Sequence, residues 1–368
     1  MKAVGITPRK AHTARLVELP MPDVDHVPNG RGVKVRILQV GVDGTDKELH
    51  LGEYGAAPEG FDFLVTGHES FGKVVEVGPN VKELEVGDYV VPTVRRPGHS
   101  LFDAIGNYDM TSDATYYERG INLRHGYMTE FFVDDPEYIV KVPKGLKHIA
   151  VLLEPMSICE KGIIQAYEIN RRLKVWRPRR VAVMGAGPIG LLAALCCRIR
   201  NLETVVFGVD KRPFRNAELL DEIGASYCSV QERSVEQEYK EHGRFDMIFE
   251  ATGFSPVVFD SMSALANNGC LILSSVTGGK RKVEVEADRL NLEFVLGNKV
   301  MFGTVNAHRG YFEQGLSDFA LSEAEFPGWL SKLLSHPVDG LENFKQVLTH
   351  LFEAKNCTKA YLNVSKDD

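Results

Sequence analysis

The sequence predicts an α/β protein with two domains, a β-rich domain followed by a doubly wound parallel sheet. The chain has 368 residues, enough for two large cores at roughly 100–200 residues per domain. Short β-branched runs separated by turns fill its first 150 residues, as in an all-β domain. Later in the chain, strands alternate with helices, an order typical of βαβ units with helices on both faces of a parallel sheet.

The β-rich domain is predicted from its β-branched runs and from the turns between them. Gly-Pro-Asn at 78–80 and Val-Pro-Lys-Gly at 142–145 are turn signals. Several short strands with frequent turns are typical of a barrel-like domain. The predicted strands are 33–38 with 40, 73–77, 88–91 and 138–142.

Residues 95–124 break this rhythm. They are rich in polar residues, contain Pro97, Gly98 and Gly106, and show no clear hydrophobic period. Long irregular segments in compact domains are usually functional. We therefore predict a functional surface lobe here.

The parallel sheet is predicted from residue 157 onward. A short apolar strand at 180–184 runs into glycines, and an apolar helix follows it. The predicted helices are 157–169, 188–200, 216–223 and one before residue 270; the strands are 180–184, 204–209, 247–249 and 270–274. Helices at 327–334 and 341–353 and a closing strand at 360–364 complete the chain.

Composition excludes several classes of protein. The chain is 44% hydrophobic and 25% charged, as in globular rather than disordered or fibrous proteins. A net charge of −7 does not favour binding to nucleic acid or to an anionic membrane. The longest apolar stretch, 189–197, is less than half of the ~20 residues that a membrane span needs, and the N-terminus does not resemble a signal peptide. We expect a cytoplasmic protein with a small-molecule partner.

The six cysteines fit a reducing compartment, because they include no CxxC pair and no disulfide-like spacing. All of them lie beyond residue 158. A metal site in the first part of the chain must therefore use oxygen and imidazole ligands.

A glycine-rich turn predicts a nucleotide site. Gly185, Gly187 and Gly190 form the pattern GxGxxG between an apolar strand and an apolar helix, with Pro188 and Ile189 inside the turn. The glycines permit a tight turn, a close approach to a pyrophosphate and close packing of helix on strand. The amide groups at the helix N-terminus favour phosphate. The alternative is a glycine turn without a ligand.

Asp210 bears on the choice of cofactor. It follows the next strand, twenty residues after Gly190, where an acidic residue would bind a ribose 2′-hydroxyl and repel a 2′-phosphate. Lys211 and Arg212 follow directly and would hold a phosphate if the loop bends toward it. A solvated basic turn is an equal alternative. NAD is favoured, and NADP stays open.

A second motif, GHExxGxxxxxGxxV at 67–81, contains His68 and Glu69. It resembles the zinc-containing alcohol dehydrogenase signature of the medium-chain dehydrogenase/reductase family. With the glycine-rich turn, the resemblance covers nearly the whole chain. It implies the medium-chain dehydrogenase fold, with a GroES-like catalytic domain at 1–156 and 307–368 and a Rossmann domain at 157–306.

Further segments resemble the archaeal glucose 1-dehydrogenases, in particular their halophilic branch. They are GVDGTD at 41–46, VPTVRR at 91–96, YERG at 117–120, EP at 154–155 and GTVN at 303–306. In that branch a hydride leaves the anomeric carbon of an aldose for NAD(P)+, and the product is the aldonolactone. The resemblance therefore implies an oxidoreductase acting on an aldose, D-glucose first, with zinc and a nicotinamide cofactor.

Position by position, the resemblance implies a catalytic zinc held by Asp43, His68 and Glu154, with Glu69 able to join them or support them. The family usually has a cysteine where this chain has Asp43, and the halophilic enzymes share the aspartate. Three protein ligands with an open fourth position make a catalytic zinc site. The alternatives are an aspartate that folds a turn and a histidine in a core.

Most zinc members of the family also bind a structural zinc through four cysteines in a lobe near residues 95–125. This chain has no cysteine there. We therefore expect one catalytic zinc per subunit, no structural zinc, and a lobe held by packing alone.

Thr45, two residues after Asp43, is placed to bond the reacting oxygen and start a proton relay, although a turn-capping hydroxyl is an alternative. By resemblance, the substrate is held by Thr45, Glu118, Glu154 and Asn306. A sugar needs such groups because each buried hydroxyl left unpaired costs about 1–3 kcal/mol. For Glu118, an ordinary solvated glutamate is nearly as plausible.

By resemblance to the family, the nicotinamide half of the cofactor is expected beside the residues that follow the late Rossmann strands, namely Ser274, Ser275, Val276, Thr304, Val305 and Asn306. Arg95 and Arg96 could reach the substrate or the cofactor phosphates, but we expect ion-paired surface arginines instead. Segments near 280–305 indicate a Rossmann-edge interface of the kind that the family uses, and hence a homo-oligomer, either a dimer or a tetramer.

Three other functions stay open: a zinc-dependent polyol or alcohol dehydrogenase, a metal-free reductase of the same fold, and a non-catalytic nucleotide sensor. Glu118 and Asn306 discriminate the first of these, because replacing either should hurt sugar turnover far more than oxidation of a small alcohol.

Overall fold

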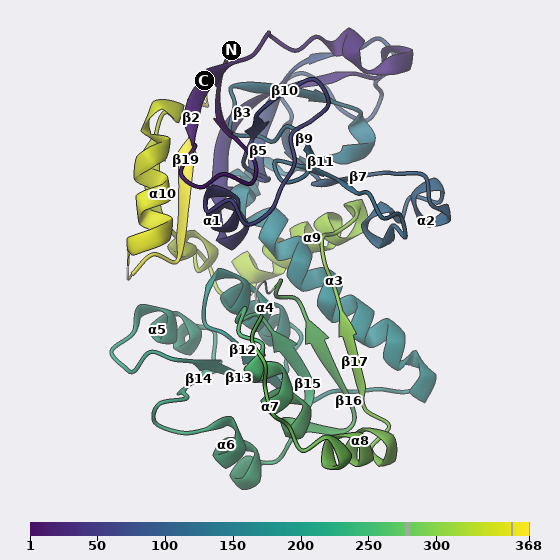
Figure 1. The fold of residues 1–368 in the computed structure, drawn as a ribbon, viewed down its shortest axis with the longest axis vertical. Helices are drawn as coiled ribbons and strands as arrows, with labels where there is room; N and C mark the ends of the chain where they lie inside the picture. The colour runs from purple at the N-terminus through teal and green to yellow at the C-terminus, as the bar shows by residue number, and fades with distance from the viewer. Residues whose placement is uncertain (277–279, 355, 368) are drawn as a thin grey trace. The chain divides into compact units, whose positions relative to one another are not determined.

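The chain forms two units, which the computed structural model describes over residues 1–276, 280–354 and 356–367 (Figure 1). Unit 1 is Met1–Glu154, Asn306–Phe319 and Leu330–Asp368, and unit 2 is Pro155–Val305 and Ala320–Trp329. The predicted catalytic domain included residues 320–329, whereas the structure groups them with unit 2. The reason is Trp329, whose indole Nε1 donates a hydrogen bond of 2.8 Å to the carbonyl of Leu219.

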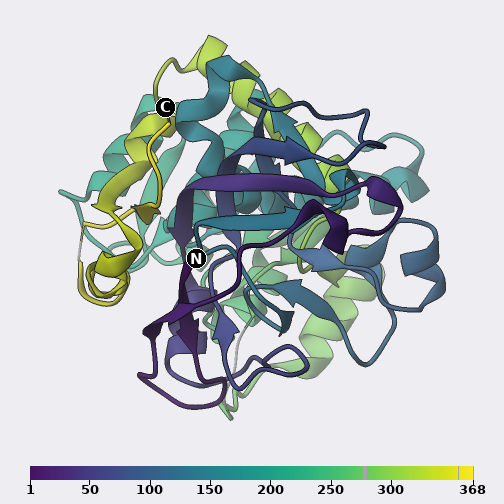
Figure 2. The same cartoon turned by 90° about the horizontal axis from the view of Figure 1, so that it is seen from above.

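The described residues of unit 1 contain a seven-stranded sheet in the order β11-β6-β5-β3-β19-β18, with β10 also paired to β3. Its strands are β3 (Val33–Val42), β5 (Glu69–Val77), β6 (Tyr89–Pro92), β10 (Phe131–Asp134), β11 (Ile139–Val142), β18 (Leu334–Asp339) and β19 (Lys359–Asn363). Strand β19 runs antiparallel to β3 with Ala360 opposite Val42, so the last strand of the chain completes a sheet begun near its start (Figure 2).

Two small sheets complete unit 1. One has the order β2-β1-β4, from β1 (Lys2–Ile6), β2 (Arg15–Glu18) and β4 (Leu64–Val65). The other has the order β7-β8-β9, from β7 (Arg95–Arg96), β8 (Tyr117–Arg119) and β9 (Leu123–Arg124), and it lies in the predicted lobe. The α-helices are α1 (Gly44–His50), α2 (Leu101–Ala104), the first part of α9 (Arg309–Glu325) and α10 (Phe344–Glu353).

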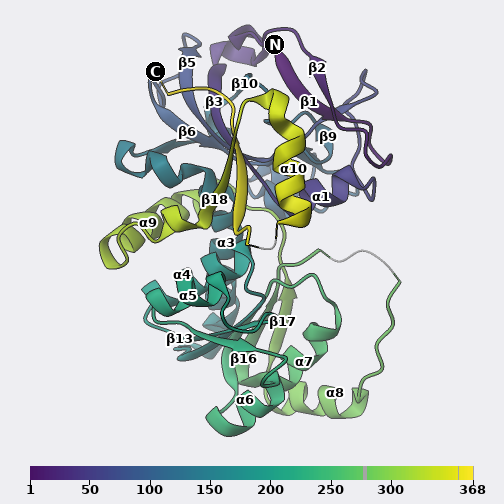
Figure 3. The ribbon, with the colours of Figure 1, turned by 90° about the vertical axis from the view of Figure 1, so that its left-hand side faces the viewer.

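The core of unit 1 joins both ends of the chain. Val35 and Ile37 on β3 are fully buried and belong to one cluster with Leu362 on β19 and Val347 on α10. Helix α10 packs beside β18 and β19 (Figure 3). This packing fixes β3 and β19, the two strands that carry functional side chains at their ends.

The described residues of unit 2 contain a six-stranded parallel sheet in the order β14-β13-β12-β15-β16-β17. The strands are β12 (Arg180–Met184), β13 (Glu203–Gly208), β14 (Ser226–Ser229), β15 (Phe245–Glu250), β16 (Leu265–Leu273) and β17 (Val300–Gly303). The helices are α3 (Leu153–Asn170), α4 (Pro188–Ile199), α5 (Arg215–Glu222), α6 (Val235–His242), α7 (Pro256–Ala264) and α8 (Ala287–Leu296).

The strand order of unit 2 reverses direction between β12 and β15. Crossovers between parallel strands are right-handed, so α4 and α5 cover one face of the sheet and α7 and α8 the other (Figure 3). The predicted α/β class and doubly wound sheet are therefore confirmed. In such sheets ligands bind beyond the carboxyl ends of the strands at the reversal point.

The predicted elements differ from the structure mainly near the C-terminus. Helix α9 was missed, and the predicted helix at 327–334 is wrong, because only a 3-10 turn occurs there before β18 begins. The 3-10 segments are Val24–His26, Pro28–Gly30, Tyr108–Met110, Pro136–Tyr138, Lys144–Leu152, Arg171–Leu173, Leu330–Leu333 and Leu341–Asn343. Across the described residues, no helix combines the length and the apolar character that crossing a membrane requires.

Candidate active site

Asp43 lies at the end of β3 and starts helix α1. Its Oδ1 accepts hydrogen bonds from the amides of Thr45 (2.8 Å) and Asp46 (3.3 Å), so Asp43 is the N-cap of the helix. Its Oδ2 lies 3.6 Å from Nε2 of His68. One carboxylate oxygen of Asp43 therefore forms the turn at the start of the helix, as in the turn-forming alternative, while the other oxygen faces the imidazole.

His68 and Glu69 lie where the chain enters β5, directly after Gly67. Gly67 has a φ of +83°, a conformation that side-chain-bearing residues rarely adopt. Glu69 lies opposite Gly41 on β3, and a Cβ at Gly41 would come within 2.1 Å of Oε2 of Glu69. Because residue 41 is glycine, the buried Glu69 carboxylate has space beside the backbone of β3.

Two buried members of this cluster, Asp46 and Lys359, were not predicted from the sequence. Oδ2 of Asp46 lies 3.9 Å from Nδ1 of His68. Lys359, the first residue of β19, forms an ion pair with Glu69. Asp46 had a local signal, because an acidic residue three positions after an N-cap aspartate is typical of a capping box. Lys359 had none, since only the pairing of β19 with β3 brings it here.

Two overlapping groups of ligand atoms share His68. The atoms of His68, Glu69 and Glu154 lie within 4.8 Å of one another, and so do those of Asp43, Asp46 and His68. The structure thus brings the other three predicted metal ligands, Asp43, Glu69 and Glu154, close to the imidazole of His68. Among the described residues, however, Asp43 and Glu154 do not occur together in one such group.

Burial gives the acids of this cluster unusual pKa values. It raises the pKa of Asp46 to about 7 and that of Glu154 to about 8, and neighbouring carboxylates act in the same direction. Burial also raises the pKa of Glu69, against the charge of Lys359. For Asp43, burial favours the neutral form, but the charge of His68 outweighs it and holds the pKa below its usual range.

His68 has the opposite behaviour. Burial disfavours its charged form, yet Asp43 and Asp46 together raise its pKa well above the usual value. Nδ1 of His68 and Oδ1 of Asp46 are buried, and neither makes a hydrogen bond to a described residue. This cluster therefore holds an excess of buried negative charge beside an imidazole, and a bound cation would offset that charge.

Thr45 lies in the first turn of α1, beside this cluster. Its Oγ1 donates a hydrogen bond of 3.4 Å to Oδ2 of Asp43. Burial raises the pKa of the neighbouring Tyr54. The Thr45 hydroxyl is therefore hydrogen-bonded to Asp43 and lies near a phenol.

Glu118 and Asn306 lie together in unit 1, although they are far apart in the sequence. Nδ2 of Asn306 donates a hydrogen bond of 2.8 Å to Oε1 of Glu118. Glu118 is only 5% exposed, so it is not the solvated glutamate considered from the sequence. Arg95 and Arg96 are each 6% exposed, which corrects the expectation of surface arginines.

The predicted nucleotide residues of unit 2 follow the carboxyl ends of its strands. Gly185 comes directly after β12 with a φ of +108°, and Gly187 is the N-cap of α4, which begins with Pro188 and Ile189. A Cβ at Gly190 would lie 1.9 Å from the carbonyl oxygen of Gly185, so the turn requires glycine there. The geometry is that of a phosphate-binding turn.

The predicted nicotinamide residues follow β16 and β17. The amide of Ser274 donates to the carbonyl of Glu250 (3.1 Å) and that of Thr304 to the carbonyl of Leu273 (2.9 Å). Ser275 accepts a hydrogen bond from the amide of Gly253 (3.0 Å). These bonds fix the backbone after both strands. Val276 and Val305 are exposed apolar side chains, at 65% and 49%.

Asp210, Lys211 and Arg212 form an exposed loop after β13. Arg212 makes two hydrogen bonds to Asp221, of 2.7 and 2.8 Å. The hydroxyl of Tyr227 donates to the carbonyl of Asp210 (2.6 Å). The loop therefore leaves the Asp210 carboxylate in solvent while Arg212 is engaged elsewhere.

The lobe at residues 95–125 is held by polar contacts as well as by packing, which corrects the expectation of packing alone. Oδ2 of Asp103 accepts hydrogen bonds from the amide and hydroxyl of Ser100 (3.0 and 2.6 Å) and from Thr111 (2.6 Å). Oδ2 of Asp134 accepts from Arg96 and Arg119, both at 2.6 Å. Carboxylates thus organise this lobe through hydrogen bonds and ion pairs.

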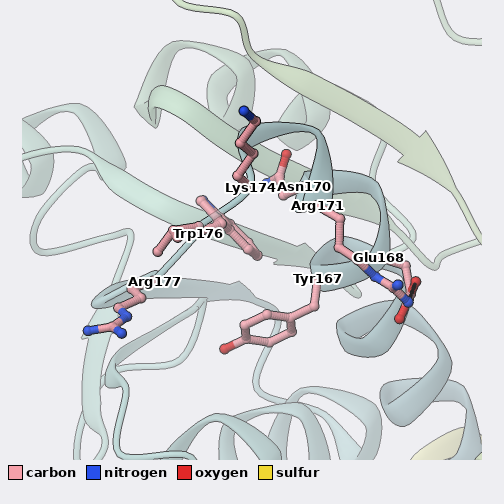
Figure 4. Close-up of a pocket in the computed structure, with 8 residues that line it drawn as sticks. Tyr167, Glu168, Asn170, Arg171, Lys174, Trp176 and Arg177 are labelled. Carbon is pink, nitrogen blue, oxygen red and sulfur yellow. Dashed lines mark hydrogen bonds and ion pairs between the residues drawn. The ribbon is translucent and has the colours of Figure 1, made fainter.

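A surface pocket of about 310 Å³ lies elsewhere in unit 2 (Figure 4). It is lined by Tyr167 and Trp176, whose rings are 5.2 Å apart, and by the basic residues Arg171, Lys174 and Arg177. These residues precede β12, at the amino end of that strand. The pocket is therefore separate from the nucleotide residues, which follow the carboxyl ends of the strands.

Comparison with known proteins gives two family matches. Residues 29–144 match the alcohol dehydrogenase GroES-like domain, and residues 147–358 match the family described as glucose dehydrogenase C-terminus. Among curated proteins, the glucose 1-dehydrogenase of Methanocella arvoryzae is 43% identical over 350 residues, covering 95% of this chain and 96% of that protein. The glucose 1-dehydrogenase of Haloferax mediterranei is 37% identical over 351 residues, covering 94% and 95%.

Solved structures give the same result. The glucose dehydrogenase of Haloferax mediterranei, in complex with NADP, zinc and gluconolactone, superposes with a TM-score of 0.89 at 35% identity, and the match covers 100% of both chains. An alcohol dehydrogenase of Thermotoga maritima superposes with a TM-score of 0.81 at 23% identity, covering 99% of both chains, which shows the shared fold.

Proposed function

Because this chain belongs to the glucose dehydrogenase family of zinc-dependent medium-chain dehydrogenases, we propose that it oxidises an aldose at the anomeric carbon. The substrate is D-glucose or a close epimer, the hydride acceptor is NAD(P)+ and the product is the aldonolactone. The observation that carries this proposal is the buried, acid-rich cluster around His68. A relative that covers the whole chain holds NADP, zinc and gluconolactone, which supports it.

The residues of the cluster fit a zinc ion. Carboxylate and imidazole are ordinary zinc ligands, and the cluster holds several buried carboxylates around one imidazole. Asp43, His68 and Glu154 would hold the ion once Asp43 and Glu154, which lie in separate groups around His68, come together on it; Glu69 is engaged by Lys359. When bound, zinc supplies a Lewis acid that stabilises negative charge on the reacting oxygen.

Thr45 orients the reacting hydroxyl of the substrate and takes part in the removal of its proton. Oγ1 of Thr45 donates a hydrogen bond of 3.4 Å to Asp43 and can accept one from the substrate hydroxyl. Asp43 does not keep the proton, because its pKa is held below the usual range. The role of Thr45 is therefore orientation of the hydroxyl and removal of its proton.

Glu118 and Asn306 hold sugar hydroxyls. Both are buried, and a buried carboxylate beside an amide offers acceptors and donors at fixed positions. This pair favours a polyhydroxylated substrate over a simple alcohol, because an apolar substrate would leave their polar atoms unpaired at a cost of about 1–3 kcal/mol each. Glu154 contributes to the metal and to the sugar.

We assign the nucleotide to the turn 185–190, to Asp210 and to the backbone after β16 and β17. NAD is favoured, since Asp210 is exposed at the 2′-hydroxyl position and Arg212 is paired with Asp221. NADP is accepted when Arg212 leaves Asp221 for a 2′-phosphate, and Lys211 would assist it. The NADP in the Haloferax mediterranei enzyme supports this second use.

We also expect one zinc per subunit and a homo-oligomer. Asp103 and Asp134 organise the cysteine-free lobe, so it needs no second ion. The edge strand β17 and helix α8 expose apolar side chains that a dimer or tetramer interface would cover: Leu292, Val295, Leu296 and Met301.

Steady-state kinetics test the proposal. We expect turnover of glucose, and of galactose or xylose more slowly, with NAD+ and with NADP+, and little turnover of sorbitol. Absence of turnover with every aldose would overturn the assignment. Turnover of sorbitol alone would favour a polyol dehydrogenase of the same family.

A further inference from the structure

Arg95 is buried directly against the proposed sugar-binding carboxylate. It lies on β7, opposite Glu118 on the antiparallel strand β8, so their side chains share one face of the small sheet. Nε and Nη2 of Arg95 donate hydrogen bonds of 3.1 and 2.7 Å to Oε1 of Glu118. The ring of Tyr116 lies 5.0 Å from the guanidinium carbon. Arg95 is thus held in place by strand pairing, an ion pair and an aromatic face.

The hydrogen bonds to Glu118 are distributed unevenly between its two oxygens. Oε1 accepts two bonds from Arg95 and a third of 2.8 Å from Nδ2 of Asn306. Oε2 accepts none from the described residues. Three donors saturate the lone pairs of Oε1, so the orientation of the carboxylate is set by the protein and Oε2 alone is offered to a ligand.

Asn306 is fixed in turn. Its Oδ1 accepts a hydrogen bond of 3.0 Å from the amide of Ala307, and its backbone has a φ of +59°. The amide nitrogen must therefore face Glu118. A charged guanidinium and a fixed amide together hold a carboxylate that is only 5% exposed, where an unpaired anion would be strongly disfavoured.

We propose that Arg95 is a positioning residue for sugar recognition: it anchors Oε1 of Glu118 so that Oε2 accepts one particular hydroxyl of the aldose. This inference rests on the proposed function. Arg95 itself touches no substrate in this arrangement, and its effect is transmitted through Glu118. Lysine would keep the charge but cannot reproduce the two donors that the rigid guanidinium directs at Oε1.

Monodeoxy sugars separate this role from a merely structural one. Wild-type enzyme, Arg95→Gln, Arg95→Lys and Glu118→Gln are assayed with glucose and with 2-, 3-, 4- and 6-deoxyglucose. In wild type, one deoxyglucose has a KM about tenfold above that of glucose, which identifies the hydroxyl on Oε2. In Arg95→Gln and Glu118→Gln this difference disappears, because KM for glucose rises about tenfold while KM for that deoxyglucose does not change. In Arg95→Lys, the difference in KM lies between that of wild type and that of Arg95→Gln.

The controls keep the outcomes distinct. Arg124→Gln, on the neighbouring strand β9, is the matched surface control and should keep the wild-type pattern. The dissociation constant of gluconolactone, measured by calorimetry, should rise in step with KM, and melting temperatures show whether each variant folds. If Arg95→Gln is unfolded, Arg95→Lys carries the test.

Two results overturn the inference. One is an equal loss with all five sugars in the Arg95 variants, and the other is a deoxy-sugar pattern in Arg95→Lys that equals wild type. If wild type oxidises no aldose, the proposed function fails instead, and gluconolactone binding by wild type and Arg95→Gln still decides whether Arg95 acts on this site.

Discussion

Two sets of buried carboxylates in unit 1 have opposite electrostatic properties. In the lobe, hydrogen bonds from Ser100 and Thr111 overcome the effect of burial and lower the pKa of Asp103 to about 2. Asp134, between two arginines, also has a pKa of about 2 against the effect of burial. Around His68, by contrast, burial raises the pKa of Asp46 to about 7 and that of Glu154 to about 8.

The difference lies in the donors. The carboxylates of the lobe face hydroxyls, amides and guanidinium groups, so their charge is satisfied by the protein itself. The carboxylates around His68 lie close to one another, and Lys359 forms an ion pair with one of them, Glu69. Buried acids of the first kind hold a structure together, whereas those of the second kind mark a functional site.

Removing Asp134 should give the largest effect on stability. Asp134→Ala leaves the buried Arg96 and the half-buried Arg119 without their shared partner. Breaking a buried ion pair in this way costs about 3–5 kcal/mol. Urea unfolding of the purified protein measures this loss. A change below about 1 kcal/mol would show that the lobe does not depend on this ion pair.

Removing His68 should abolish metal binding and activity while the lobe stays intact. His68→Ala deletes the ligand common to both groups, so we expect at least a 100-fold loss of turnover, about 2.7 kcal/mol. Elemental analysis should find no stoichiometric zinc. Retention of one zinc per subunit in this variant would contradict the assignment of the site.

Removing Asp46 should weaken metal binding rather than abolish it. Its Oδ2 is 3.9 Å from Nδ1 of His68, close enough for its charge to act on the ring whose Nε2 faces Asp43. Supports of this kind typically contribute about 10–100-fold in metal affinity. Competition with a chelator gives the zinc affinity of Asp46→Asn, and an unchanged affinity would assign Asp46 to helix capping alone.

Asp103 should give the smallest effect, and one that depends on pH. Its pKa is lowered on folding, so its stabilising contribution is complete above about pH 4 and is lost as the pH falls toward 2. Asp103→Asn should cost about 1–3 kcal/mol at pH 7 through its lost hydrogen bonds. Unfolding at several pH values should show this difference shrinking in acid; a constant difference would mean that the charge plays no part.

Much of the fold could be predicted because its signals are local. The apolar run 180–184 ends in glycine, and β12 has those bounds. Helix α9 was missed because Gly310 and Gly315 weaken its helical pattern, although Phe312 and Phe319 share a buried face. Tertiary packing of those two aromatic residues outweighs the low propensity.

In the candidate site, too, the residues with a local sequence signal were predicted and those without one were not. His68 and Glu69 belong to one short motif, and Asp43 to another, so sequence patterns were sufficient to find them. Lys359 and Arg95 reach their partners through the pairing of β19 with β3 and of β7 with β8. Such register is set by the whole sheet, and the residues themselves carry no local sign of it.

Asp43 couples two equilibria that are separate in most metal sites. One of its oxygens closes the first turn of α1 and the other faces His68. A thiolate at this position would be a softer ligand but a poor helix cap. A substitution at residue 43 that changes the affinity for the ion therefore also changes the stability of the first turn of α1. The same coupling applies to natural and to engineered variants.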